Sequence, residues 1–198
     1  MTPVPRPIVY RADVSDDAEL RLIGDPAGKR AIELGIGEGM LALALAERGA
    51  KAMAIDPDEE RVAAARQEAD RSNVRVQFHH GELADLGFAT SASIDIAISA
   101  GTLGRTDDVP RLLRQVHRVL KTDGALIVGL EHPVAGMLDG ATVRRYYGSA
   151  PHRSLADVFM ALHRANFRVD NVQELFPKDD TTAMSPVVLL LRARKMGA

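Results

Sequence analysis

The stretch from Ala31 to Gly39 constrains the fold more than any other part of the chain. It reads Ala-Ile-Glu-Leu-Gly-Ile-Gly-Glu-Gly, an apolar run with one acid that ends in three alternate glycines, and a helical pattern follows from Met40 to Glu47. Glycine adopts positive φ at little cost and has no Cβ, so a ligand can approach the backbone of such a turn. The glycine string alone is a weak signal, but its position between a strand and a helix predicts a ligand-binding α/β unit.

The composition is that of an ordinary globular protein, with 198 residues, 46% of them hydrophobic, and a net charge of −2. This small charge predicts neither nucleic acid nor a membrane surface as a partner. Cysteine is absent, which excludes disulfides and cysteine–zinc sites, and the histidine–carboxylate spacings predict no other metal site. The apolar runs are too short to span a bilayer and the N-terminus lacks a signal-peptide core, so we expect a cytoplasmic protein.

Apolar strand patterns alternate with helical patterns over most of the chain. The expected strands are 30–34, 51–55, 74–78, 94–99 and 125–130, and the expected helices include 38–48 and 108–120. Successive βα units predict a parallel sheet with helices on both faces. A further helix begins at Ser154 with a capping-box-like pair to Asp157, and its expected buried face is Leu155, Val158, Phe159 and Leu162.

The last two strand patterns, 167–175 and 187–194, are joined by a loop alone, which predicts an antiparallel pair. We expect one domain over 1–198. Its parts are an N-terminal arm (1–29), a cofactor-binding core (30–132), an acceptor-site segment (133–153) and a helix with the terminal hairpin (154–198). The arm, whose single aromatic residue is Tyr10, is expected to fold over the glycine turn.

Five segments in order carry a resemblance to a known family: Glu33–Gly39, Asp56, Gly81–Leu86, Ile94–Ser99 and Val119–Gly124. Together with the terminal hairpin they resemble a class I S-adenosylmethionine-dependent methyltransferase of the kind that acts on small molecules. The resemblance implies an α/β, Rossmann-like, seven-stranded and mostly parallel sheet of order 3-2-1-4-5-7-6, with the seventh strand antiparallel. A nicotinamide dehydrogenase is the main competitor, but GxGxxG would require glycine where the chain has Met40.

S-adenosylmethionine is the implied cofactor, and S-adenosylhomocysteine the implied product. Ligands of open parallel sheets bind beyond the carboxyl ends of the strands, where the unusual residues of this chain fall. Free N–H groups of the glycine turn are expected to bind the methionine carboxylate. The implied cofactor residues are Tyr10, Glu33, Gly35, Ile36, Gly37, Gly39, Asp56, Pro57, Glu82, Leu83, Ser99 and Ala100.

Alternatives stay open for the acidic members of this set. Asp56 is expected to accept the ribose hydroxyls, but it is also a good N-cap for the next helix, and both roles require different oxygens. Glu82 and the Leu83 N–H would bind adenine, or Glu82 is a solvated acid in a surface turn. Glu33 lies inside a strand and needs a partner, either the amino end of the cofactor or nearby backbone N–H groups.

The implied reaction is an in-line SN2 displacement that carries the sulfonium methyl to a small-molecule acceptor, with O-methylation slightly favoured. His132 is the candidate general base, although a structural imidazole is an equal alternative. The candidate acceptor residues are His132, Arg145, Tyr146, Tyr147 and His152, against the alternative of a solvated basic loop. A non-catalytic cofactor-binding or regulatory protein is the competing function, and we expect a monomer or a homodimer.

Overall fold

The computed structural model describes residues 4–103, 106–139, 142–144, 147–148 and 153–197. Its strands are β1 (Arg30–Leu34), β2 (Lys51–Asp56), β3 (Val76–His80), β4 (Ile94–Ala100), β5 (Leu120–Glu131), β6 (Leu138–Asp139), β7 (Thr142–Val143), β8 (Phe167–Leu175) and β9 (Val188–Lys195). Its α-helices are α1 (Asp17–Leu20), α2 (Leu41–Ala46), α3 (Glu59–Arg71), α4 (Val109–Val119) and α5 (Leu155–Arg164), and a 3-10 turn covers Ala135–Met137.

Seven of these strands form one sheet in the order β3-β2-β1-β4-β5-β9-β8. The pairs from β3 to β5 are parallel, whereas β9 runs antiparallel to both β5 and β8. This confirms the predicted fold class and strand order, since β8 and β9 are the strands counted sixth and seventh in the sequence. The two extra numbers belong to a short hairpin, β6–β7, which the sequence analysis did not predict. The division of the chain into parts stays a prediction.

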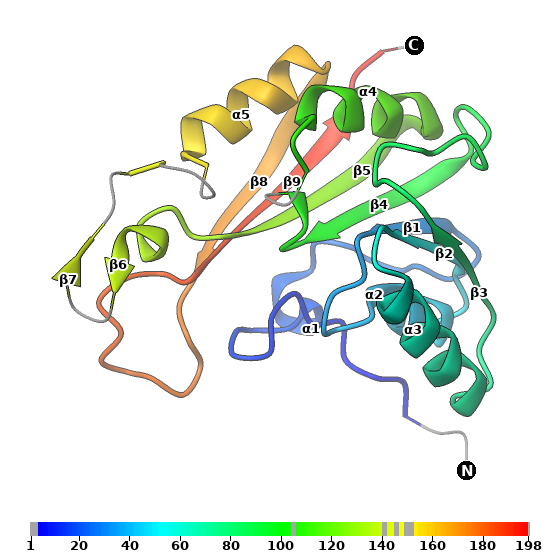
Figure 1. Cartoon of the computed structure of the whole chain (residues 1–198), viewed down its shortest axis with the longest axis horizontal. Coiled ribbons are helices and arrows are strands. Elements are labelled where there is room, and N and C mark those ends of the chain that lie inside the picture. The colour runs from blue at the N-terminus through cyan, green and yellow to red at the C-terminus, as the bar shows by residue number, and fades with distance from the viewer. Residues whose placement is uncertain (1–3, 104–105, 140–141, 145–146, 149–152, 198) are drawn as a thin grey trace.

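Both faces of the sheet are covered, as Figure 1 shows: α4 and α5 lie on one side, and α1, α2 and α3 lie on the other. The alternation of strand side chains divides the core accordingly. Ile32 packs in the same apolar cluster as Leu112 of α4 and Leu162 of α5, whereas Ala31 packs in a second cluster with Leu41 of α2. Burial of this apolar surface on two faces is the main force that holds the layers together.

Two predicted boundaries near the glycine turn and at β5 were wrong. Helix α2 begins at Leu41 rather than at residue 38, because Met40 has a left-handed backbone with φ of 40° and prolongs the turn. Strand β5 begins at Leu120 rather than at residue 125. Leu120 pairs with Ile94 and Ala125 with Ile96, so residues 121–124 form a bulge within the strand instead of ending the preceding unit.

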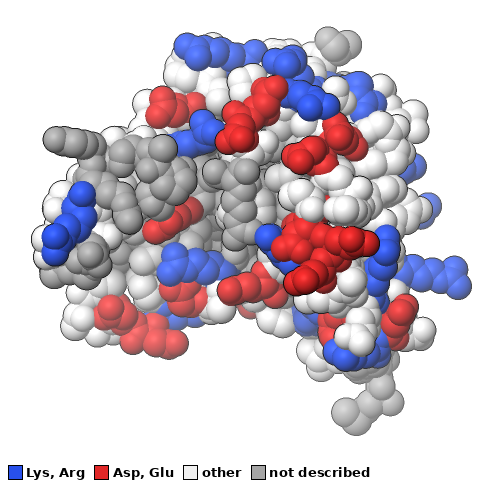
Figure 2. All heavy atoms as spheres, in the orientation of Figure 1, with Lys and Arg blue, Asp and Glu red and all other residues white. Residues whose placement is uncertain are grey.

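The N-terminus of α5 follows the prediction, with a capping box between Ser154 and Asp157. Its predicted buried face was wrong in part, because Phe159 is 46% exposed while Val158 and Leu162 are buried. Strand β3 is also displaced by two residues from the predicted range. Acidic and basic side chains are mixed over the face shown in Figure 2. No helix in the described part of the chain has the length and apolar character needed to cross a membrane.

Candidate cofactor site

Hydrogen bonds from backbone N–H groups bring the glycine turn, the end of β2 and the segment after β3 to one edge of the sheet. The Gly35 N–H donates to the Ile55 carbonyl (2.8 Å), and the Ile36 N–H donates to Oδ2 of Asp56 (2.7 Å). The Gly81 N–H donates to the Asp56 carbonyl (3.1 Å). Three segments that are far apart in the sequence therefore meet where the parallel strands end, which is where open α/β sheets bind ligands.

Glu33 lies in β1 directly beneath this turn and is 1% exposed. Its carboxyl group accepts from the N–H groups of Gly37 (3.2 Å) and Ala42 (2.8 Å). Burial raises the pKa of Glu33 to about 7, because desolvation outweighs the opposing effect of these backbone donors. Glu33 therefore has partners within the protein, as one of the two predicted alternatives requires.

The protein itself uses several of the N–H groups that the sequence analysis expected to be free. Those of Gly35, Ile36 and Gly37 donate to Ile55, Asp56 and Glu33, respectively. Among the described residues, the N–H groups of Glu38 and Gly39 have no hydrogen-bond acceptor. Donors for an anionic ligand group are thus confined to the later part of the turn.

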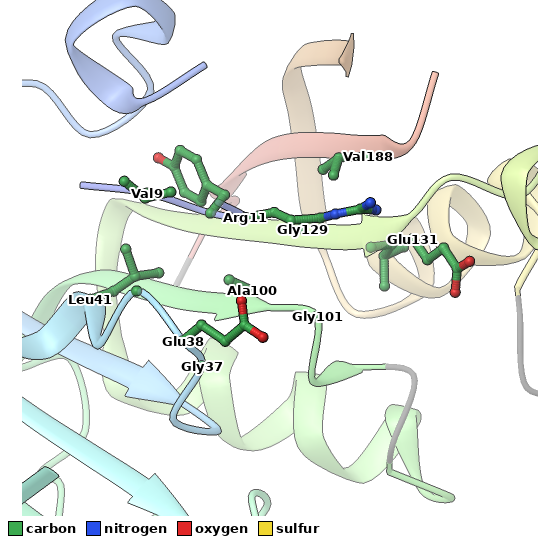
Figure 3. A pocket seen from close by; sticks show the side chains of 13 residues that line it. Val9, Arg11, Gly37, Glu38, Leu41, Ala100, Gly101, Gly129, Glu131 and Val188 are labelled. Atoms are coloured by element: carbon green, nitrogen blue, oxygen red, sulfur yellow. The ribbon is translucent and has the colours of Figure 1, made fainter. Parts of the chain in front are cut away.

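A pocket of about 300 Å³ opens beside this later part of the turn. Figure 3 shows the Glu38 side chain extending from the turn towards Ala100 at the end of β4, with Gly129 of β5 above them in this view. Gly37 leaves the wall open, since a Cβ at this position would meet only the Ala100 carbonyl oxygen, at 3.6 Å. The lining residues are Val9, Tyr10, Arg11, Gly37, Glu38, Gly39, Leu41, Ala100, Gly101, Gly129, Leu130, Glu131 and Val188.

The N-terminal arm forms one wall of this pocket, as expected. Tyr10 lines it, and its hydroxyl donates to Oδ1 of the buried Asp17 (2.8 Å). Burial, together with the Asp17 carboxylate, raises the pKa of Tyr10. Arg11 also lines the pocket, but its guanidinium is held by Asp13, with Nε at 2.7 Å from Oδ1. A Cβ on Gly39 would overlap the Val9 carbonyl, so glycine there admits the arm rather than a ligand.

Asp56 is 1% exposed, and each of its carboxylate oxygens accepts a backbone N–H, Oδ1 from Asp58 (2.8 Å) and Oδ2 from Ile36. The guanidinium of Arg61 lies 3.5 Å from Oδ2. The suggested N-cap role of Asp56 was wrong, because Asp58 caps α3 by accepting from the N–H groups of Glu60 and Arg61. Its ribose-binding role stays a prediction.

The pocket is not lined by Pro57, Glu82 or Leu83, the residues predicted to border the adenine. The Pro57 carbonyl lies 3.0 Å from Nε2 of His80. Glu82 is exposed, whereas Leu83 is buried within the core and Ser99 is fully buried. Of the two cofactor residues predicted at the end of β4, Ser99 and Ala100, only Ala100 lines the pocket. Adenine and ribose binding by these residues therefore stay predictions.

His132 is buried and does not line the pocket, although its neighbour Glu131 does. Its Nδ1 accepts from the Val134 N–H (3.2 Å), and its Nε2 lies 3.0 Å from Oε1 of Glu174. Both ring nitrogens thus have protein partners, an arrangement that fits the structural alternative better than a free general base. The catalytic role of His132 stays a prediction.

Tyr147 is 49% exposed, and its hydroxyl oxygen accepts from the Leu155 N–H (3.3 Å). Arg145, Tyr146 and His152 lie outside the described residues. Nine of the thirteen residues that line the pocket were not among the predicted site residues. Gly101 and residues 129–131 lie at the carboxyl ends of β4 and β5. Because ligands of open α/β sheets bind at these ends, the position of these residues in the sequence was a usable signal. Val188 begins an antiparallel strand at the same edge and carried no such signal.

A ligand pocket at the carboxyl edge of the parallel strands, with an antiparallel strand inserted beside β5, defines a class I methyltransferase fold. The "Methyltransferase domain" family model matches residues 32–128, through β1, the glycine turn and β4 into β5. A solved S-adenosylmethionine-dependent methyltransferase from Mesorhizobium loti is 26% identical, with a TM-score of 0.74 over 90% of this chain and 96% of that one. The chain belongs to the class I S-adenosylmethionine-dependent methyltransferases, and S-adenosylmethionine is the cofactor of that family.

Curated relatives include two proteins named ubiquinone biosynthesis O-methyltransferase. The protein from Azorhizobium caulinodans is 31% identical over 104 residues, and one from Xanthomonas oryzae is 32% identical over 104 residues. These matches cover 51% and 52% of this chain, but the chain spans only 40% and 44% of the relatives. A solved structure from Listeria monocytogenes, described as a putative S-adenosylmethionine-dependent methyltransferase, is 22% identical. Its TM-score is 0.72 over 91% of this chain and 98% of that one, and it supports the fold alone.

Proposed function

We propose that this protein transfers the methyl group of S-adenosylmethionine to a small-molecule acceptor, with an oxygen nucleophile slightly favoured. The observation that carries the proposal is the pocket that runs from Gly37–Gly39 to the ends of β4 and β5. Its two ends offer room for a cofactor tail and an adjoining acceptor. The O-methyltransferase relatives support the preference for oxygen.

The residues present fit the cofactor at its methionine end. Glu38 and Gly39 line the pocket, and their uncommitted N–H groups would donate to the methionine carboxylate. Tyr10 closes the same end, held in place by Asp17. When bound, the cofactor supplies a methyl group on a positively charged sulfur.

Asp56 retains hydrogen-bonding capacity for a ribose. A carboxylate has about four lone-pair sites, and Asp56 uses one on each oxygen for a backbone N–H. The remaining sites would accept the ribose hydroxyls, while Pro57, Glu82 and Leu83 would border the adenine. This assignment extends the edge formed by the glycine turn and β2 towards the segment after β3.

The acceptor would lie at the other end of the pocket, among Arg11, Leu130, Glu131 and Val188. The chain's contribution there is to hold the nucleophile in line with the methyl group and the sulfur and to exclude water. Such positioning can supply about 7–11 kcal/mol of barrier reduction. His132 is the proposed base for a hydroxyl acceptor, a role that requires one of its ring nitrogens to leave its partner, Val134 or Glu174. The protein would act as a monomer or homodimer, in the cytoplasm.

The alternative is a non-catalytic or regulatory cofactor-binding protein. One observation favours it: both ring nitrogens of His132 already have hydrogen-bond partners, Val134 at Nδ1 and Glu174 at Nε2. A methyltransferase that relies on positioning needs no base, so this observation does not remove the catalytic reading.

Thermal unfolding with S-adenosylmethionine, S-adenosylhomocysteine and NAD tests the cofactor. A ligand at 100 times its dissociation constant adds about 2.7 kcal/mol to the free energy of unfolding. We expect this from the first two compounds, and stabilisation by NAD alone would overturn the proposal. Release of S-adenosylhomocysteine over a panel of phenols, alcohols and amines then separates catalysis from binding.

The base is tested with His132→Ala against His163→Ala, a matched change at an exposed histidine of α5. A general base predicts a fall of about 10²-fold or more in kcat for His132→Ala with cofactor affinity retained. Equal kcat values for the two variants would show that His132 is a structural residue and not the general base.

A further inference from the structure

Two buried hydroxyl groups lie beneath the start of the glycine turn. Ser99 is 0% exposed and Thr102 is 2% exposed. Oγ1 of Thr102 donates to the carbonyl oxygen of Leu34, the last residue of β1. Oγ of Ser99 lies 2.7 Å from Oγ1 of Thr102, so Ser99 is the donor of that second bond. The hydroxyl of Thr102 therefore joins the segment after β4 to the exact point at which the glycine turn begins.

The side chain of Thr102 also occupies the space that a side chain on Gly35 would need. Gly35 has φ of 82°, and a Cβ there would lie 2.8 Å from Oγ1 of Thr102 and closer still to its methyl group. Contacts this short are repulsive, so Gly35 and Thr102 fit only as a pair. Both the positive φ of Gly35 and its contact with Thr102 thus require glycine at this position, independently of a ligand.

These contacts join two walls of the cofactor pocket. Gly37 and Gly39 belong to the turn that Thr102 holds through Leu34, and Ala100 and Gly101 directly precede Thr102 in the chain. The N–H of Gly101 donates to the Gly129 carbonyl (2.8 Å), which fixes this second wall to β5. Among the described residues, the Thr102 hydroxyl is the side-chain donor that spans from the β4 wall to the glycine turn.

We propose that Thr102 is a positioning residue for the cofactor, whose hydroxyl sets the spacing between the glycine turn and the end of β4. The inference rests on the proposed cofactor site. Without the hydroxyl, the buried Leu34 carbonyl has lost its side-chain donor, and the turn can move relative to Ala100 and Gly101. If the walls of the pocket are not held in place, the ligand must order them when it binds. The conformational entropy lost in this ordering weakens the affinity for the ligand.

Thr102→Val tests this by removing the hydroxyl while keeping the branched shape. We expect the dissociation constant for S-adenosylhomocysteine, measured by calorimetry on the full chain, to rise about tenfold. Thr106→Val is the matched control, because Thr106 lies on the same segment and contributes its backbone carbonyl to Arg153. The control should bind within about twofold of the unmodified protein. Equal affinity for Thr102→Val and the control, even with a lower melting temperature, would make Thr102 merely structural and overturn the inference.

Thr102→Ser and Thr102→Ala provide a second comparison if the valine variant does not fold. Both lack the methyl group and differ only by the hydroxyl, so serine should restore the affinity and alanine should lose it. Equal dissociation constants for these two variants would also overturn the inference. Failure of the unmodified protein to bind S-adenosylhomocysteine would instead contradict the proposed function, so the two failures are distinguishable.

Discussion

The buried carboxyl group of Glu33 makes the stability of the fold depend on pH in a predictable direction. Burial raises its pKa in the folded state to about 7, from an ordinary value of 4.5. Between these values the folded protein binds more protons than the unfolded chain, so the free energy of unfolding attributable to Glu33 falls as pH rises. Each pKa unit corresponds to about 1.4 kcal/mol, which gives a loss of about 2 to 3 kcal/mol between pH 5 and pH 8.

Glu33→Gln isolates this contribution, because glutamine does not ionise and all other titrating groups are shared. Urea unfolding of both proteins at pH 5 and pH 8 gives the difference in free energy at each pH. We expect the advantage of the unmodified protein over the variant to shrink by about 2 to 3 kcal/mol at the higher pH. An advantage that is constant across this range, or that grows, would refute the reasoning, because Glu33 would then be ionised in the folded protein at pH 5.

Three further predictions concern the turn and its surroundings. Gly35→Ala should destabilise the fold by about 2 kcal/mol or more, because the added methyl group overlaps Thr102. Gly37→Ala should leave the melting temperature nearly unchanged and should weaken S-adenosylhomocysteine binding about tenfold in calorimetry. Asp56→Asn should weaken the same binding about tenfold or more, because an amide cannot accept at both former carboxylate oxygens; an unchanged affinity would remove Asp56 from the site. Arg6→Ala should lower the free energy of unfolding by about 1 kcal/mol at low salt, and less at high salt, because Arg6 joins the arm to Glu47 (2.7 Å).

The sheet could be predicted from the sequence because its parallel strands are apolar and most of them are separated by a helix. The terminal pair was equally clear, since no helix lies between residues 175 and 188. Local errors arose where backbone conformation departed from residue preference. Met40 and Asp123 both adopt positive φ, at 40° and 59°, although neither is glycine, so α2 begins later and β5 begins earlier than their patterns indicate.

The site was predictable only in part, because a sequence gives the edge at which residues gather but not the direction of each side chain. Tyr10, Gly37 and Ala100 line the pocket. Ser99 precedes Ala100 in β4, but its side chain is buried and contacts the hydroxyl of Thr102. One step along a strand reverses the face, so a motif that covers both residues does not say which one meets the ligand.

The three glycines of the turn show why such a motif is a weak predictor when it is considered alone. Gly35 makes room for Thr102 and Gly39 makes room for the carbonyl of Val9, so both serve contacts within the protein. A Cβ on Gly37, by contrast, would make only an ordinary contact at the pocket wall, 3.6 Å from the Ala100 carbonyl oxygen. Two of the three therefore depend on segments distant in the sequence, the end of β4 and the N-terminal arm. A glycine turn of this kind binds a cofactor only when those segments are in place, which is why Gly35→Ala and Gly37→Ala should fail in different assays.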